Sequence, residues 1–253
     1  MVAKIEHDAK AIADEVRRAI AELKDTSEDK DKGVVTRVGD GVAWIYGLRG
    51  CGYNEMIEIE GSGNSETVAA FALNLAEDEI GAVVLGEDDE VRAGARVRLS
   101  GRALSVPVGS ELVGRIIDPL GRPLDGGDDL KTGQLGEIER RAPGVIERQA
   151  VHEPMLTGLT AIDAMVPIGR GQRELIIGDR QTGKTAIAID TMINQTRQKT
   201  GVINIYVAIG QKSAKIARLV ERLKSEGVMP QTIIVATSAA DPAPLQYLAP
   251  YAG

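Results

Sequence analysis

Apolar residues in the first 24 positions recur at spacings of three and four, which predicts one amphipathic helix over 3–24. Its apolar stripe is formed by Ile5, Ala9, Ile12, Val16, Ala19 and Leu23. Charged side chains occupy the other faces, so the helix either docks on its own domain or binds a partner at the tip of an assembly. The polar run over 24–32 is typical of a solvated linker.

From position 33 to about 104 the pattern changes to short apolar stretches interrupted by glycine. The sequence predicts strands over 34–38, 42–46, 56–59, 67–75, 81–85 and 96–99, with a tight turn at 39–41. Short strands at this spacing favour a small closed β-barrel, because closure removes exposed strand edges. A connection punctuated by Pro and Gly follows over 107–144.

In the last third of the chain, short apolar runs alternate with longer stretches of helical period. Strands are predicted over 174–177, 202–208 and 232–237, and helices over 184–196 and 213–226. Ser213 is expected to cap the second helix, with Gly227 beyond its end. This alternation is typical of a parallel sheet in an α/β domain. The predicted domains are a helix with linker (1–28), a β-barrel (29–104) and an incomplete α/β domain (105–253).

The candidate chemistry lies between the first strand and the first helix of that domain, at Gly178-Asp179-Arg180-Gln181-Thr182-Gly183-Lys184-Thr185. The run matches G-x-x-x-x-G-K-[ST], the phosphate-binding loop, and the helix that begins after it takes in Ala186. Backbone N–H groups of the loop and the positive end of the helix dipole are expected to hold phosphate oxygens. The Lys184 ammonium is expected to bind the β- and γ-phosphates, and the Thr185 hydroxyl is expected to ligate Mg²⁺.

The composition of the chain excludes several classes of function. The net charge of −7 and the scarcity of aromatic residues (3%) argue against nucleic-acid binding, which needs clustered Lys and Arg or stacking surfaces. A zinc site built on His and Cys is excluded by the two histidines, which lie far apart, and the single cysteine. The sequence has no run of 18 apolar residues and no apolar segment typical of a secretory signal at its start. We therefore expect a cytosolic or membrane-peripheral protein.

The amino-acid sequence around the loop resembles that of the α subunits of F-type ATP synthases. The resemblance is carried by PIGRGQREL (167–175) running into the loop, by GVIER (144–148), AIGQK (208–212) and LQYLAPYAG (245–253). It extends from the first helix to the last residue. The implied fold is an N-terminal helix, a small β-barrel and a RecA-like phosphate-loop domain, in that order.

The resemblance implies a subunit that binds ATP or ADP with Mg²⁺ without turning it over. In that family α and β subunits alternate in a hexamer, and only β carries catalytic sites. Gln211 stands where β has the glutamate that polarises the attacking water, and a neutral amide can orient a water but not take its proton. Arg180 and Gln181 are also α-type residues at their loop positions. The alternative is that Gln211 only marks the entry to a helix.

Partners and location are implied in the same way. They are β subunits, a γ-type central stalk and a δ-type stator subunit bound by the N-terminal helix, with no nucleic acid. The complex would couple ATP synthesis or hydrolysis to H⁺ transport, and this chain would lie on the cytoplasmic face of an energy-transducing membrane, the bacterial plasma membrane. Because α subunits of that family continue past Gly253, we expect a chain truncated within its nucleotide-binding domain, without the acidic strand near the metal.

Two other functions compete with this one. An autonomous hexameric motor, such as a Rho-like nucleic-acid translocase, shares the order of barrel and RecA-like domain, but the acidic charge and Gln211 count against it. A structural remnant without nucleotide binding is opposed by the intact loop. Elsewhere, Cys51 is expected to be a structural thiol and His152 a surface or interface residue. Solvated turn residues, rather than a cation site, are expected at Asp118, Asp125, Asp128 and Asp129.

Overall fold

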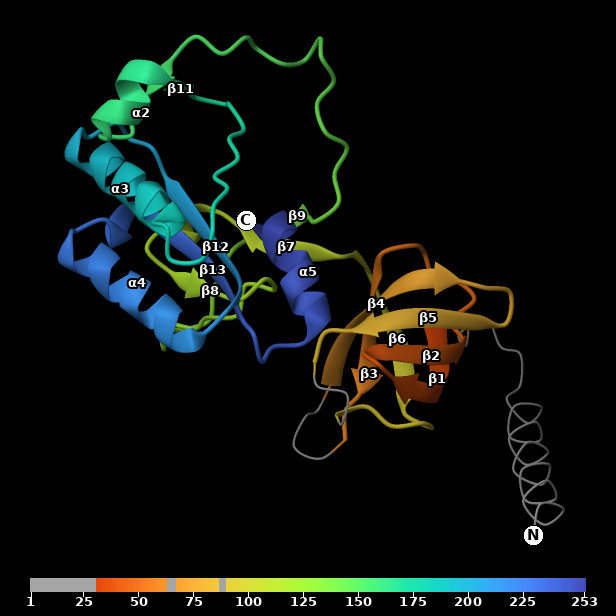
Figure 1. Cartoon of the computed structure of the whole chain (residues 1–253). Coiled ribbons are helices and arrows are strands. Elements are labelled where there is room, and N and C mark those ends of the chain that lie inside the picture. The colour runs from red at the N-terminus through yellow and green to blue at the C-terminus, as the bar shows by residue number, and fades with distance from the viewer. Residues whose placement is uncertain (1–30, 63–66, 87–89) are drawn as a thin grey trace, which may run out of the picture. The chain divides into compact units, whose positions relative to one another are not determined.

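The computed structural model describes residues 31–62, 67–86 and 90–253. The helix predicted over 3–24 lies outside these residues. The chain divides into two compact units between Gly101 and Arg102 (Figure 1). The predicted limits of 29–104 and 105–253 for separate folding domains stay a prediction.

The first unit contains a closed antiparallel barrel. Its strands are β1 (Lys32–Gly39), β2 (Val42–Gly47), β3 (Glu55–Glu60), β4 (Thr67–Leu75), β5 (Glu79–Val84) and β6 (Arg96–Ala103). They follow one another around the barrel in the order β1-β2-β5-β4-β3-β6. The predicted barrel is therefore confirmed, and each predicted strand is present with ends shifted by a few residues at most.

Alternation of side chains explains why these segments close on themselves. The pairs Ala43 and Ile45, and Ile57 and Ile59, are each two residues apart and fully buried inside the barrel. β1 and β2 are joined at Gly39↔Val42 by the predicted tight turn, in which Asp40 and Gly41 have φ angles of 54° and 77°. Positive φ at both central residues matches the right-handed twist of the flanking strands.

The second unit is of α/β type. Its helices are α2 (Thr160–Met165), α3 (Lys184–Arg197), α4 (Ser213–Ser225) and α5 (Ala243–Ala252), with 3₁₀ turns η3 (Ser110–Leu112) and η4 (Met229–Gln231). Its strands are β7 (Ser105–Val108), β8 (Ile116–Ile117), β9 (Gln134–Glu137), β10 (Pro154–Met155), β11 (Ile168–Gly169), β12 (Asn204–Gln211) and β13 (Thr232–Ser238). β7 pairs with β9, and β10 with β11, in two small antiparallel sheets.

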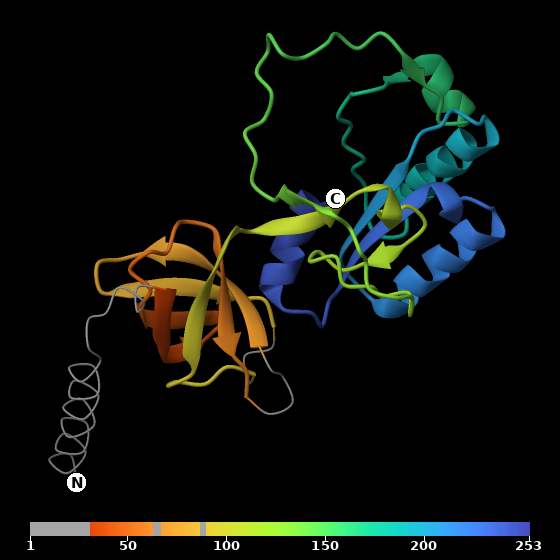
Figure 2. The same ribbon diagram turned by 180° about the vertical axis from the view of Figure 1, so that it is seen from behind.

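The central sheet of this unit has the order β12-β13-β8, and both of its pairings are parallel. Ala208 and Ile234 face α3 and α4 in one apolar cluster, whereas Ile233 and Val235 face the side where Ala252 of α5 packs. Figures 1 and 2 show α3 and α4 on one side of these strands and α5 on the other. The predicted parallel α/β sheet is confirmed, and its central strand β13 is buried along almost its whole length, as a strand covered on both faces is.

Two local predictions were wrong. Residues 174–177 form no strand, and the side chains of Leu175 and Ile177 are 82% and 86% exposed. An apolar run becomes a strand only beside a neighbour, and no described strand pairs with this one. Ser213 is the first residue of α4, and Lys212 occupies the N-cap position. Within the connection over 107–144, the two-residue strand β8 adds a third strand to the central sheet.

Candidate functional site

The phosphate-binding motif ends at the first turn of α3. Gly183 is the N-cap residue of α3 with a φ of 91°, and Lys184 and Thr185 are the first two helical residues. A left-handed φ is open to glycine at little cost and strained for other residues. The first N–H groups of a helix, including that of Ala186, have no acceptor within the helix and point toward its N-terminal end. The predicted junction of loop and helix is therefore formed.

The loop before α3 folds tightly on itself. The Thr182 hydroxyl donates to the carbonyl oxygen of Asp179 at 2.8 Å, and Gln181 adopts a φ of 65°. A Cβ atom on Gly178 would lie 2.9 Å from Thr182 Oγ1, so this close approach favours glycine. The loop residues from Gly178 to Gly183, Arg180 among them, are all exposed. The loop thus presents its backbone to solvent at a helix N-terminus.

The Lys184 ammonium donates hydrogen bonds to the carbonyl oxygens of Gly178 and Asp179. These bonds hold its positive charge against the backbone of the loop. Together with the helix N-terminus, the charge makes the loop complementary to a polyphosphate. The residues present therefore fit a nucleotide phosphate group.

A divalent cation would find few protein ligands in this unit. Among the described residues, no group of three His, Cys, Asp or Glu side chains comes close enough to hold a metal ion. Mg²⁺ commonly keeps several waters and binds through one or two protein groups together with substrate phosphates. The Thr185 hydroxyl beside the loop fits that mode of binding.

Gln211 is the last residue of β12, where it pairs with Ser238 of β13. Its Nε2 donates to the Tyr206 hydroxyl at 3.3 Å. Because α3 leads into β12 and packs on its face, the helix runs back along the strand. The first turn of α3 and the end of β12 consequently lie at the same, carboxyl edge of the sheet. Ligands bind at this edge in open α/β sheets.

Two residues that the sequence analysis did not single out fix the segment before α2: Asp163 joins it to α2, and Gln195 joins it to α3. The carboxylate of Asp163 accepts from the Thr157 N–H and hydroxyl at 2.8 and 2.7 Å and from the Gly158 N–H at 3.0 Å. The side-chain and backbone hydrogen bonds from Thr157 lower the pKa of the Asp163 carboxyl below its ordinary value. Gln195 near the end of α3 donates to the carbonyl oxygen of Leu156 at 2.6 Å. No local motif marks the contact of Gln195, because its partner lies 39 positions away on a separate segment.

All four acidic residues after β8 were expected to be solvated. The structure shows that this is wrong for Asp118. Asp118 is buried and accepts from the backbone N–H groups of Leu120 and Arg122 at 2.9 and 2.7 Å. Asp125 forms a two-pronged ion pair with Arg115, at 2.6 Å to Nε and 3.0 Å to Nη2. The hydrogen bond from Arg115 is the main cause that lowers the pKa of the Asp125 carboxyl well below its ordinary value. Both carboxylates stabilise turns.

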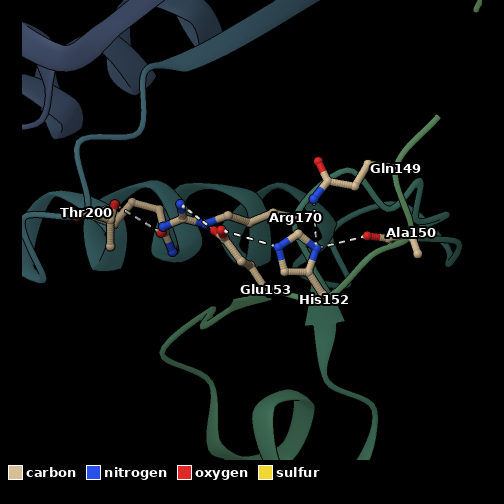
Figure 3. Close-up of polar contacts among 7 residues, drawn as sticks. Gln149, Ala150, His152, Glu153, Arg170 and Thr200 are labelled. Carbon is tan, nitrogen blue, oxygen red and sulfur yellow. Dashed lines mark hydrogen bonds and ion pairs between the residues drawn. The ribbon is translucent and has the colours of Figure 1, made fainter. Parts of the chain in front are cut away.

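His152 lies in an exposed segment. Figure 3 shows its ring between Ala150 and Glu153. Its Nδ1 lies 3.0 Å from the carbonyl oxygen of Ala150, and its Nε2 lies 3.8 Å from a Glu153 carboxylate oxygen. The other oxygen of Glu153 accepts from Arg170 Nη1 at 3.2 Å. The pair of Glu153 with Arg170 joins the start of β10 to the end of β11. His152 itself is exposed and is therefore a surface residue, as expected.

Cys51 packs against the barrel core. Burial, helped by the nearby charge of Glu55, raises the pKa of the Cys51 thiol to about 11. A thiol with a raised pKa is a poor nucleophile at neutral pH, which agrees with the expected structural role. Within the described part of the chain, no helix has the length and apolar character needed to span a bilayer.

Comparison with known proteins places both units in one family. Residues 30–101 match the beta-barrel domain, and residues 158–253 the nucleotide-binding domain, of the ATP synthase alpha/beta family. The chain is 52% identical over 242 residues to "ATP synthase subunit alpha" of Marinobacter nauticus and 51% identical to "ATP synthase subunit alpha 2" of Hahella chejuensis. Each alignment covers 96% of this chain and 46% of the relative, so the chain spans a little under half the length of these relatives.

Proposed function

This chain belongs to the ATP synthase alpha/beta family, and we propose that it is an α-type subunit that binds Mg-ATP without hydrolysing it. One observation carries the proposal: a complete phosphate loop opens α3, while a glutamine ends β12 at the same edge of the sheet. The loop provides affinity for a nucleoside triphosphate. The glutamine withholds the proton acceptor that hydrolysis needs.

Binding depends on positive charge and on backbone donors. The Lys184 ammonium moves from the loop carbonyls to the β- and γ-phosphates, while the N–H groups of Gly183, Thr185 and Ala186 donate to phosphate oxygens. The Thr185 hydroxyl holds Mg²⁺, which neutralises phosphate charge when bound. The flanking residues Asp179, Arg180, Gln181 and Thr182 shape the loop around the phosphates.

Hydrolysis is withheld because Gln211 is neutral. A water attacking the γ-phosphate must lose a proton, and a carboxylate beside it accepts that proton or polarises the water. An amide donates and accepts hydrogen bonds but does not take a proton near pH 7. Gln211 therefore orients a water or a phosphate oxygen while the bound triphosphate persists.

The proposed setting is the catalytic sector of an F-type ATP synthase. There the chain alternates with β subunits in a hexamer, faces a γ-type stalk, and binds a δ-type stator subunit through its first residues. The assembly couples ATP synthesis or hydrolysis to H⁺ transport across a membrane that this chain reaches only through other subunits. We propose that the chain lies on the cytoplasmic face of a bacterial plasma membrane. Its likeness to ATP synthase alpha subunits from two bacteria supports this location.

The proposal is tested by calorimetric Mg-ATP binding to the 253-residue chain, with phosphate release followed in the same samples. Lys184→Ala removes the ammonium from the loop and is expected to abolish binding. Lys215→Ala serves as the matched control, because Lys215 lies exposed on α4 of the same unit. Wild type and control should bind ATP and release no phosphate.

Two outcomes contradict the proposal. Phosphate release that depends on Lys184 would identify a self-sufficient motor, and binding of RNA or single-stranded DNA by the same chain would then favour the translocase alternative. Equal ATP affinity of wild type and Lys184→Ala, or no affinity in either, would show that the loop is not a working nucleotide site in this chain.

A further inference from the structure

The end of β12 contains an irregularity that determines where Gln211 points. Ala208 pairs with Ala236, and the next aligned pair is Gln211 with Ser238, so three steps on β12 match two steps on β13. The extra residue forms a β-bulge. Gly210 within it has a φ of 58°, a left-handed conformation that favours glycine.

The bulge reverses the alternation of side chains along β12. In a regular strand, residues 206 and 211 would face opposite sides of the sheet, because they are an odd number of positions apart. With one residue inserted, Gln211 faces the same side as Tyr206, and its amide donates to the Tyr206 hydroxyl at 3.3 Å. Tyr206 packs against the cluster that includes Ile189 and Met192 of α3. The bulge thus turns Gln211 toward the helix that opens with the phosphate loop.

A buried hydroxyl closes the bulge. Thr237 is 1% exposed, and its Oγ1 accepts from the Gly210 N–H at 3.4 Å and donates to the Ala208 carbonyl oxygen at 3.2 Å. These backbone groups flank the bulge on β12, and Thr237 joins them across it from β13. Because buried polar groups without partners are costly, loss of this hydroxyl would favour another conformation at the end of β12.

We propose that Thr237 and Tyr206 are positioning residues for Gln211. Thr237 holds the bulge that turns the glutamine toward α3, and Tyr206 anchors one N–H of its amide. The remaining N–H and the Oε1 atom are thereby held toward the terminal phosphate of a nucleotide bound at the start of α3. The identity of that ligand rests on the proposed function, whereas the positioning itself does not.

Positioning is tested first without nucleotide, by NMR of the Gln211 side-chain amide in the ¹⁵N-labelled 253-residue chain. Gln211→Glu removes this signal and so assigns it. Tyr206→Phe and Thr237→Val should each shift the signal, whereas Thr237→Ser keeps the hydroxyl and should restore it. Thr232→Val is the matched control, because Thr232 is also buried on β13 and its hydroxyl donates to the Val228 carbonyl oxygen, away from the bulge.

The second measurement compares ATP with ADP binding by calorimetry. If Gln211 contacts the terminal phosphate, then Gln211→Ala, Tyr206→Phe and Thr237→Val each weaken ATP binding roughly three- to tenfold and leave ADP binding unchanged. A double variant of Gln211→Ala with Tyr206→Phe should lose no more than the larger single loss. A merely structural role would weaken both nucleotides alike.

The outcomes separate this inference from the proposed function. An unchanged Gln211 signal in Tyr206→Phe and Thr237→Val overturns the inference even if the wild type binds ATP. A shifted signal in a chain that binds no ATP supports the positioning and overturns the proposed function. Fully additive losses of ATP affinity would also overturn the inference. If Thr237→Val does not fold, Tyr206→Phe and Thr237→Ser decide the same questions.

Discussion

Asp125 is expected to be the main polar support of the segment that adds β8 to the central sheet. Its carboxylate binds Arg115 twice and accepts from the backbone N–H groups of Ile116 and Gly127 at 3.2 and 2.9 Å. Ile116 belongs to β8, which pairs with β13. Replacing Asp125 therefore loosens both the turn and the edge strand of the nucleotide-binding unit.

The magnitude follows from the burial of the ion pair. Fully exposed pairs contribute about 0.2–1 kcal/mol, whereas hydrogen bonds to charged groups contribute about 1.5–3 kcal/mol. The side chains of Arg115 and Asp125 are 24% and 18% exposed, which places this pair in the lower part of the second range. We expect Asp125→Ala to lower the free energy of unfolding by about 2 kcal/mol. Asp125→Asn keeps one oxygen for the backbone donors and should cost about 1 kcal/mol.

The assay is urea denaturation at pH 7, with Asp129→Asn as the control on an exposed neighbouring carboxylate. The pH dependence has a definite sign. The pKa of Asp125 is lower in the folded than in the unfolded chain, so its contribution is complete above the unfolded pKa of about 4 and is lost as the pH falls through the folded pKa. Wild type should lose stability below about pH 4 more steeply than Asp125→Asn. Equal stabilities at pH 7, or parallel acid curves, would refute the reasoning.

Three further predictions concern separate parts of the chain. Leu223→Ala creates a cavity where α4 meets the sheet and should lower the free energy of unfolding by about 2–5 kcal/mol in urea melts, against little change for the exposed Glu221→Ala. At pH 8, alkylation of Cys51 should be about a hundredfold slower than that of a small free thiol, because its pKa of about 11 depletes the thiolate; labelling at the free-thiol rate would contradict this. Gly183→Ala meets no neighbouring atom but strains the left-handed N-cap by about 1 kcal/mol, so ATP affinity in calorimetry should fall at least about fivefold. Gly133→Ala has neither problem and should bind as wild type.

Local patterns were sufficient for most of the secondary structure. The two-residue alternation that places Ala43 and Ile45 inside the barrel can be recognised within a few consecutive residues. The same is true of the apolar stripe of α4. The phosphate loop was also readable, because its function depends on contiguous backbone and one helix N-terminus. Family membership followed from the same stretches, since they contain whole motifs rather than scattered residues.

The features that could not be predicted depend on contacts between residues that lie far apart in the sequence. The apolar run over 174–177 looks like a strand by itself, yet a strand exists only through a neighbour that local sequence does not specify. The pairing of Asp125 with Arg115 was missed for the same reason, since the two lie 10 positions apart across β8 and its turn. An acidic residue in a glycine-rich turn gives no local sign of a partner.

The sequence by itself determined the order of barrel and α/β unit, the phosphate loop, and the presence of an amide at Gln211. Only the tertiary structure decided which way that amide faces. Its direction depends on a bulge held by Thr237, a residue on another strand 27 positions from Gly210. The physical reason is that a one-residue insertion reverses every later side chain on a strand, and the insertion is defined only by register against the neighbouring strand.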